Sequence, residues 1–304
     1  MSAGVLLMAY GTPERLDEVE PYYTHIRRGR PPTPAQLEEL VERYRAVGGP
    51  TALGEMTRAQ AAGLEAELAR RGFPVPVHVG FKHVAPFVGD AVRAMAGRGI
   101  TRAVGLVLAP HYSLRSVAEY AAYAEEARPA SMAIDVIPSW HDHPSLVEAL
   151  SARLARARQG VAHNGAAGPL VLFTAHSVPA VAVERGDPYP EQLRETSRLV
   201  AERAGVERWE VAWQSAGRTD EEWLGPDVSE AIAAAAKRGE RAVVVHAVGF
   251  VADHLEVLYD LDVEARAAAE SRGLAFARVA MPNADPDFLA ALADVVAPRL
   301  AEAP

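Results

Sequence analysis

The chain has 304 residues, of which 49% are hydrophobic and 23% charged, which is typical of a globular protein long enough for two domains. Its 31 basic and 40 acidic residues give a formal net charge of −9, which argues against a general nucleic-acid binder. Cysteine is absent, which excludes disulfides, thiolate metal sites, iron–sulfur clusters and cysteine nucleophiles. Any metal chemistry must therefore use His, Asp, Glu or Tyr.

The first residues contain no basic segment and only a short apolar run, so they predict a first strand rather than a signal peptide. No run of the sequence approaches the roughly 20 apolar residues that a membrane helix needs. We therefore expect a cytoplasmic protein without a membrane span.

Short apolar runs alternate along the chain with longer segments rich in Ala, Leu, Glu and Arg, a pattern typical of parallel strands joined by crossover helices. The strands are nearly continuous in apolar residues, as expected where helices cover both faces of a sheet. The predicted strands are residues 4–9, 75–80, 103–109, 133–137, 169–175, 209–214 and 241–248. The predicted helices are residues 34–46, 55–71, 86–98, 115–127, 144–158, 190–204, 227–238, 255–272 and 285–301.

The two halves of the sequence resemble each other. Residues 6–13 are similar to residues 171–179, and residues 103–110 are similar to residues 242–249, each pair running from an apolar strand into small or polar residues. These similarities indicate an internal duplication. The fold class is therefore α/β, with two similar Rossmann-like domains, residues 1–140 and 141–304, and a last helix free to pack back on the first domain.

Polar residues follow several predicted strands at their carboxyl ends, where open α/β sheets bind ligands. Tyr10, His176 and the segment 253–256 all lie at such ends. With two domains facing each other, we expect these residues to converge on one cleft.

Three carboxylates follow the predicted strand 241–248. Glu256, Asp260 and Glu264 lie at i, i+4 and i+8, so an α-helix would stack them on one face about 6 Å apart. Like charges so close repel each other unless water, a cation or a base compensates them. The row therefore suggests a path for a cation, and the alternative is a solvated helix face. Asp253 fits two roles equally well: the N-cap of the predicted helix, or a direct part in the chemistry of the site.

His176 follows an apolar strand, where it either caps the strand by hydrogen bonding or takes part in chemistry. Together with Glu256 it suits transient binding of a borderline divalent metal such as Fe²⁺. One of the two is alternatively a proton acceptor, because a metal ligand and a base both need a free lone pair. The sequence leaves these roles open.

A basic and aromatic segment covers residues 22–34 and includes Arg27, Arg28 and Arg30. Guanidinium groups beside aromatic rings suit a flat anionic ligand, since they pair with carboxylates, and the alternative is a solvated loop. Similar side chains follow in the first half: Arg43, Tyr44, Thr51, Lys82 and His83. Walker, G-x-G-x-x-G, G-x-S-x-G and His-Glu-x-x-His motifs are absent from the sequence, so nucleotide-dependent, hydrolase and zinc-protease functions are not indicated.

Over essentially its whole length the chain resembles the ferrochelatases, and most closely the short coproporphyrin type of Gram-positive bacteria. The stretches that carry the resemblance are Met8-Ala9-Tyr10-Gly11-Thr12-Pro13, residues 22–30, residues 108–113, Ala175-His176-Ser177-Val178-Pro179, Trp213-Gln214-Ser215, residues 223–228 and residues 248–260.

The resemblance implies a lyase of haem biosynthesis that inserts Fe²⁺ into coproporphyrin III to give iron coproporphyrin, with the porphyrin in the cleft between two chelatase-type domains. It makes His176 and Glu256 the catalytic and iron-handling pair, and it makes Asp260 and Glu264 a relay for metal or protons where Mg²⁺ could also bind. Tyr10 would face the iron from the other side of the ring. The residues implied at the propionates or porphyrin edges are Arg27, Arg43, Tyr44, Thr51 and Tyr120, and further candidates are Arg28, Lys82, His83, Trp223 and Asp253.

The alternatives are a protoporphyrin IX ferrochelatase, a chelatase of a sirohydrochlorin-type ring, and a non-catalytic haem carrier. Tyr10 favours coproporphyrin, because the resemblance to the coproporphyrin type includes a Tyr at this position, where the protoporphyrin enzymes have a Met. Thr51 stands where relatives have Ser, which keeps the hydroxyl, and the lack of Cys excludes the iron–sulfur cluster of some relatives. Iron is then a substrate and no prosthetic group is expected. We expect a monomer that contacts a downstream haem-synthesis enzyme transiently and binds no nucleic acid.

Overall fold

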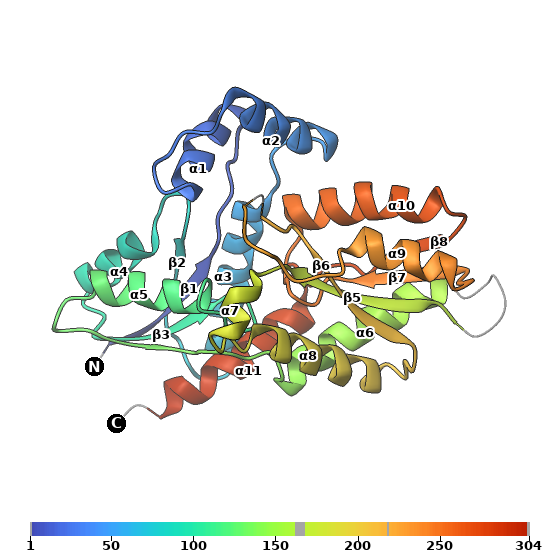
Figure 1. Cartoon of the computed structure of the whole chain (residues 1–304). Coiled ribbons are helices and arrows are strands. Elements are labelled where there is room, and N and C mark those ends of the chain that lie inside the picture. The colour runs from blue at the N-terminus through green and yellow to red at the C-terminus, as the bar shows by residue number, and fades with distance from the viewer. Residues whose placement is uncertain (1, 162–167, 218, 303–304) are drawn as a thin grey trace. The chain divides into compact units, whose positions relative to one another are not determined.

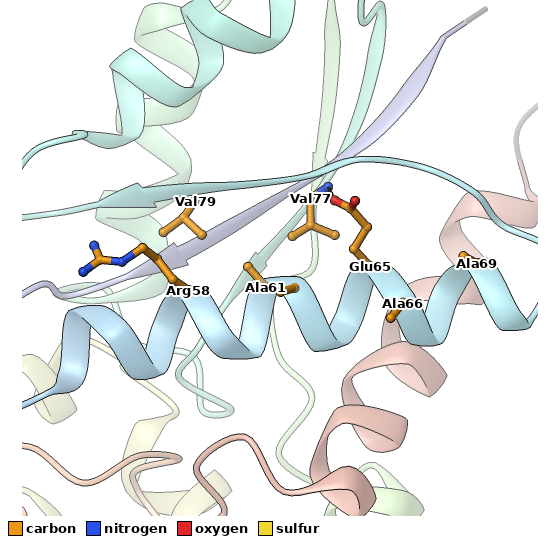
Figure 2. Close-up of a pocket in the computed structure, with 8 residues that line it drawn as sticks. Arg58, Ala61, Glu65, Ala66, Ala69, Val77 and Val79 are labelled. Atoms are coloured by element: carbon orange, nitrogen blue, oxygen red, sulfur yellow. Dashed lines mark hydrogen bonds between the residues drawn. The ribbon is translucent and has the colours of Figure 1, made fainter.

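The computed structural model describes residues 2–161, 168–217 and 219–302 (Figure 1). It divides into two compact units. The first consists of Met1–Trp140, Ala252–His254 and Asn283–Pro304, and the second of His141–Val251 and Leu255–Pro282.

The first unit is built on a four-stranded parallel sheet in the order β2-β1-β3-β4. Its central strand β1 has four consecutive side chains, Val5 to Met8, that are fully buried. An unbroken apolar run of this kind forms where helices cover both faces of the sheet. The strands are β1 (Ala3–Ala9), β2 (Val77–Phe81), β3 (Arg102–Val107) and β4 (Ala133–Val136).

Helices α4 and α5 pack on each other and on the sheet. The core that they cover includes Met8, Met95 and Ala103. Helices α3 and α11 pack together, and α3 also contacts β2. Helix α2 begins at a capping box in which the Thr33 hydroxyl accepts from the amide of Gln36. The helices are η1 (Leu16–Glu18), α1 (Val19–Ile26), α2 (Pro34–Ala46), α3 (Leu53–Arg70), α4 (Val88–Gly97), α5 (Val117–Ala127) and α11 (Pro286–Ala301).

The second unit repeats this topology with a parallel sheet in the order β6-β5-β7-β8. The likeness extends to the loops: Phe81 donates its amide proton to Pro86, and Trp213 donates its amide proton to Pro226, in each case just before a helix. The internal repeat expected from the sequence is therefore confirmed. The strands are β5 (Leu170–His176), β6 (Trp209–Gln214), β7 (Ala242–His246) and β8 (Ala275–Arg278).

In the second unit, α9 and the helical segment after β7 cover one core, which includes Leu172, Val245 and Leu261. Helix α6 packs on α8 and contacts β7 and β8. The helices are α6 (Pro144–Val161), α7 (Ala180–Glu184), α8 (Tyr189–Arg203), α9 (Val228–Lys237), the π-helix η3 (Val257–Ala265) and α10 (Arg266–Glu270).

Some predictions about the elements were wrong, and the short helices η1 and α7 were also not predicted. Residues 255–272 were expected to form one α-helix, but Val257–Ala265 form a π-helix, whose hydrogen bonds reach one residue further along the chain. Strand β8 was missed because it has four residues, all partly exposed. Helix α1 was missed because the basic and aromatic residues 22–34 read as a binding segment or a loop. In the part of the chain that the structure describes, no helix has the length and apolar character to cross a membrane.

Candidate active site

His176 is the last residue of β5 in the second unit, and the segment after β7 lies close beside it. Gly249 makes this approach possible: a Cβ at that position would lie 2.4 Å from Ala175 Cβ and 2.8 Å from Ala175 Cα, and the Gly249 amide donates to the Thr174 carbonyl. The chain then continues to Glu256, whose Oε1 lies 3.8 Å from His176 Nε2. Both side chains are about one-third exposed, at 37% and 35%. The structure therefore brings together the two residues that the sequence singled out.

The second ring nitrogen of His176 fixes its tautomer. Nδ1 lies 2.6 Å from the Ser177 carbonyl oxygen, which only accepts, so Nδ1 carries the proton in the neutral ring. Nε2 then presents a lone pair on the side of Glu256. This hydrogen bond also fixes the orientation of the ring, so that Nε2 is the nitrogen that can accept a proton or bind a metal.

Asp260 lies one step behind Glu256 and is almost fully buried, with 5% of its surface exposed. Its carboxylate accepts hydrogen bonds from the Ser215 hydroxyl and, at 3.4 Å, from the Gln214 amide, which also donates to the Glu256 carbonyl at 3.2 Å. Thr174 donates to the Gln214 carbonyl oxygen at 3.0 Å, which orients that amide. Ser215 adopts a left-handed conformation with φ 59°, which is rare outside Gly. A buried carboxylate is thus held by neutral donors.

Glu264, the third acid of the row, is exposed, so the three acids occupy three different environments. Asp260 and Glu264 lie on the π-helix η3 and not on an α-helix, and the expectation of one continuous face stays a prediction. Among the residues that the structure describes, no group of three or more His, Cys, Asp and Glu side chains is placed to hold one metal ion.

Trp223 lies beside His176, with 6.2 Å between ring centroids, and donates to the Thr219 hydroxyl. The Trp223 segment pairs with the residues after His176 through the amide of Leu224, which donates to the Val178 carbonyl. Tyr189 is close enough to Glu256 that the carboxylate adds to burial, the main cause, in raising the phenol pKa.

Asp253 belongs to the first unit, where it forms a reciprocal pair with Asn283. The Asp253 amide donates to Asn283 Oδ1 at 2.9 Å, and Asn283 Nδ2 donates to Asp253 Oδ2 at 2.8 Å. This pair fixes the backbone at Asp253 within the first unit.

In the first unit, Tyr10 follows β1 and is 41% exposed. Its ring packs against the imidazole of His83, with 4.4 Å between centroids, and the amide of His83 donates to the Tyr10 carbonyl at 3.0 Å. His83 Nδ1 in turn lies 3.0 Å from His25 Nδ1. Burial, with contributions from Lys82 and His25, lowers the pKa of His83 to about 3, so this ring is neutral at physiological pH.

Lys82 links this group to α5. Its ammonium lies 2.6 Å from Glu119 Oε2 and 5.4 Å from the ring centroid of Tyr120. Arg28 also approaches Glu119, at 3.9 Å. Tyr120 is buried, and its pKa is raised well above the ordinary value by burial first and then by Tyr10. Tyr10, Lys82, His83 and Tyr120 therefore form one cluster.

The remaining predicted contacts lie on α1, α2 and the turn that follows. Arg27 lies over the Tyr23 ring at 5.6 Å, and Arg43 pairs with Glu39 at 3.5 Å. Tyr44 is 1% exposed, and Thr51 is 9% exposed with a buried hydroxyl that has no hydrogen-bond partner among the described residues.

Sequence reasoning gave no role to Gln214, Ser215 or His25, although all three stand in stretches that carried the resemblance. The available signal was position: Gln214 ends a strand, and Ser215 follows it.

Comparison with solved structures first gives the class of fold. The structure is similar to the chelatase SirB of Bacillus subtilis with Fe³⁺, with a TM-score of 0.59 at 14% identity over 99% of this chain and 98% of that one. It is also similar to CbiX, the terminal enzyme of sirohaem biosynthesis in denitrifying bacteria, with a TM-score of 0.55 at 15% identity over 97% and 98% of the two chains. The fold is that of the chelatases.

The family is more specific than the fold. The ferrochelatase family model matches residues 2–300, and the chain belongs to this family. It is 46% identical to a ferrochelatase of Thermus thermophilus over 96% of this chain and 98% of that protein. It is 43% identical to the coproporphyrin III ferrochelatase of Bacillus subtilis over 98% of this chain and 97% of that protein.

Proposed function

We propose that the protein inserts Fe²⁺ into coproporphyrin III. The observation that carries the proposal is the His176–Glu256 pair, with the Nε2 lone pair of a tautomer-fixed imidazole 3.8 Å from a half-buried carboxylate. Relatives from Bacillus subtilis and a Geobacillus species, each 43% identical, are coproporphyrin III ferrochelatases, which supports this ring over protoporphyrin IX.

Insertion of a divalent metal releases two pyrrole N–H protons, so the site needs a base as well as a place for the cation. We assign the base to His176 Nε2, because Nδ1 is already committed to the Ser177 carbonyl, and Nε2 takes the two protons in turn and passes each to the solvent that reaches its partly exposed ring. Glu256 then guides Fe²⁺ toward the macrocycle, since its carboxylate lies 3.8 Å from His176 Nε2 and oxygen ligands bind divalent cations. Distortion of the macrocycle toward the transition state would present each pyrrole lone pair to the metal.

Asp260 and Glu264 have separate roles in this proposal. The buried Asp260 supports Glu256 through Gln214, while the exposed Glu264 meets cations from solvent. We propose that Mg²⁺ also binds at Glu264, the exposed end of the row, because Mg²⁺ is commonly bound by carboxylate oxygens together with several waters. Equilibrium dialysis against Mg²⁺ should show binding that Glu264→Gln weakens.

Coproporphyrin III carries four propionates, and the first unit offers cations and hydroxyls for them. We propose that the propionates bind to Arg27, Arg28, Arg43 and Lys82, because guanidinium and ammonium groups form charge-assisted hydrogen bonds with carboxylates. The hydroxyl of Thr51 has no hydrogen-bond partner among the described residues, so it can donate to a propionate without breaking another bond. Tyr44 and Tyr120 support this surface from buried positions, and Tyr10 contacts the macrocycle.

An anaerobic absorbance assay with Fe²⁺ tests the function. Coproporphyrin III should be converted to iron coproporphyrin, and protoporphyrin IX should be converted much more slowly. Equal turnover of both rings would contradict the substrate assignment, while no metal insertion with retained haem would favour a carrier. Turnover of a sirohydrochlorin-type ring with cobalt would favour the other chelatase function.

The physiological setting is part of the proposal. We propose a cytoplasmic monomer that passes iron coproporphyrin to a downstream haem-synthesis enzyme. Sedimentation of the purified protein at several concentrations tests the monomer.

A further inference from the structure

His25, on α1, forms a hydrogen bond with His83, which follows β2 and stands 58 positions later in the chain. The two Nδ1 atoms are 3.0 Å apart, so one nitrogen must carry a proton and the other must offer a lone pair. Two protonated nitrogens would repel each other, and two lone pairs would form no bond. The distance therefore specifies one proton shared by the pair.

Three further ring contacts surround the His25–His83 pair. The His25 ring stacks on Phe87, with 5.2 Å between centroids and 24° between planes. The His83 ring packs on Tyr10 on its other side and meets the edge of Tyr22 at 6.4 Å. His83 is thus held by Tyr22, by the hydrogen bond to His25 and by its backbone bond to the Tyr10 carbonyl.

Tyr10 depends on this arrangement, because it is 41% exposed and its ring has His83 as a packing partner. The orientation of the phenol therefore depends in part on the orientation of the His83 ring. Without the hydrogen bond, the His83 ring would rotate about its side-chain torsions, and the Tyr10 ring would lose this packing contact.

We propose that His25 is a positioning residue for iron insertion, which holds the imidazole of His83 against Tyr10 and so fixes the phenol that contacts the macrocycle. The inference rests on the proposed function, in which Tyr10 meets the porphyrin. His25 contacts neither the porphyrin nor the iron in this scheme.

The test compares His25→Phe, which keeps the ring and its stacking on Phe87, with His25→Asn, which returns a donor or acceptor near Nδ1. His25→Phe should lower kcat for iron insertion about tenfold and leave the KM for coproporphyrin III within twofold. His25→Asn should restore part of the loss. Phe87→Leu, which removes the stacking partner and leaves both imidazoles in place, is the matched control for a packing effect and should change kcat by less than twofold.

Two readouts separate positioning from a general structural role. In a Tyr10→Phe background, His25→Phe should lower kcat by less than twofold further, because residues that act through one another are not additive. The visible absorption of bound ferric coproporphyrin, which responds to a phenol near the iron, should shift in His25→Phe as it does in Tyr10→Phe.

A wild-type protein that inserts no iron would overturn the proposed function and this inference together. An active wild-type protein with normal kcat in His25→Phe, or with fully additive losses in the double variant, would overturn the inference alone. An equal loss in Phe87→Leu and His25→Phe would also overturn it, since packing would then explain both.

Discussion

His176 Nε2 and Glu256 Oε1 lie 3.8 Å apart, and His176 Nδ1 is bonded to the Ser177 carbonyl oxygen at 2.6 Å. Nδ1 therefore has a structural role, and Nε2 is the nitrogen that can accept a proton or bind a metal. Nε2 is therefore the atom through which the ring acts, which gives the first prediction its direction.

His176→Ala should lower the rate of iron insertion at least 100-fold, within the range by which a lost general base slows a reaction. Coproporphyrin III binding, followed by fluorescence quenching, should stay within threefold of wild type. His254→Ala is the matched control, because His254 bonds to its own loop at the Ala252 carbonyl and is exposed to a similar degree. Normal turnover by His176→Ala would remove His176 from the mechanism.

Ser215→Ala should destabilise the protein by about 1.5–3 kcal/mol, because the Asp260 carboxylate is buried and loses a hydrogen bond to a charged group. Ser215→Gly should lose about 1 kcal/mol less, since Gly adopts the left-handed conformation of this residue freely. Urea unfolding measures both. If the two variants are equally stable, the left-handed backbone at Ser215 carries no cost.

His246 predicts how stability depends on pH. This residue of β7 is 2% exposed, and burial, with a smaller contribution from Arg153, lowers its pKa from 6.5 to about 3. Below pH 6.5, His246 binds a proton in the unfolded chain but stays neutral in the folded protein. The free energy of unfolding therefore falls as the pH drops from 6.5 toward 3. The cost is about 1.4 kcal/mol for each pH unit in that window.

His246→Val should therefore flatten the acid side of the stability curve. Urea midpoints at pH 7 and pH 5 measure the effect: the wild type should lose more free energy of unfolding between them than the variant. His83, whose pKa is lowered similarly, leaves some acid sensitivity in both proteins. Equal losses in the variant and the wild type would mean that His246 is not the group that titrates.

The fold was largely predictable because its strands are continuous apolar runs, as in β1 and β5, and because the repeat is visible in the residues that follow them. Tyr10 and His176 could be located for the same reason, since strand ends in parallel sheets collect ligand-binding groups. The partners of these residues could not be located. Ser215 and Asp260, or His25 and His83, meet only through long-range folding, and their spacing in the sequence carries no periodic signal.

The π-helix shows another limit of the sequence. The i, i+4, i+8 spacing of Glu256, Asp260 and Glu264 fits an α-helix, and residue types alone do not distinguish hydrogen bonds to the fourth and fifth residue. Packing of Leu261 and Ala265 into the core, with Asp260 held by Ser215, accompanies the wider turn.

Gly249→Ala should lower iron insertion about 100-fold, because its Cβ would lie 2.8 Å from Ala175 Cα and push the Glu256 segment away from His176. A displacement of about 1 Å can cost that much in catalysis. Steady-state kinetics and urea unfolding measure the effect on rate and stability. Gly160→Ala, in α6 with open space around the new Cβ, is the matched control and should leave both unchanged or raise stability slightly. Full activity in Gly249→Ala would mean that this close approach does not position Glu256.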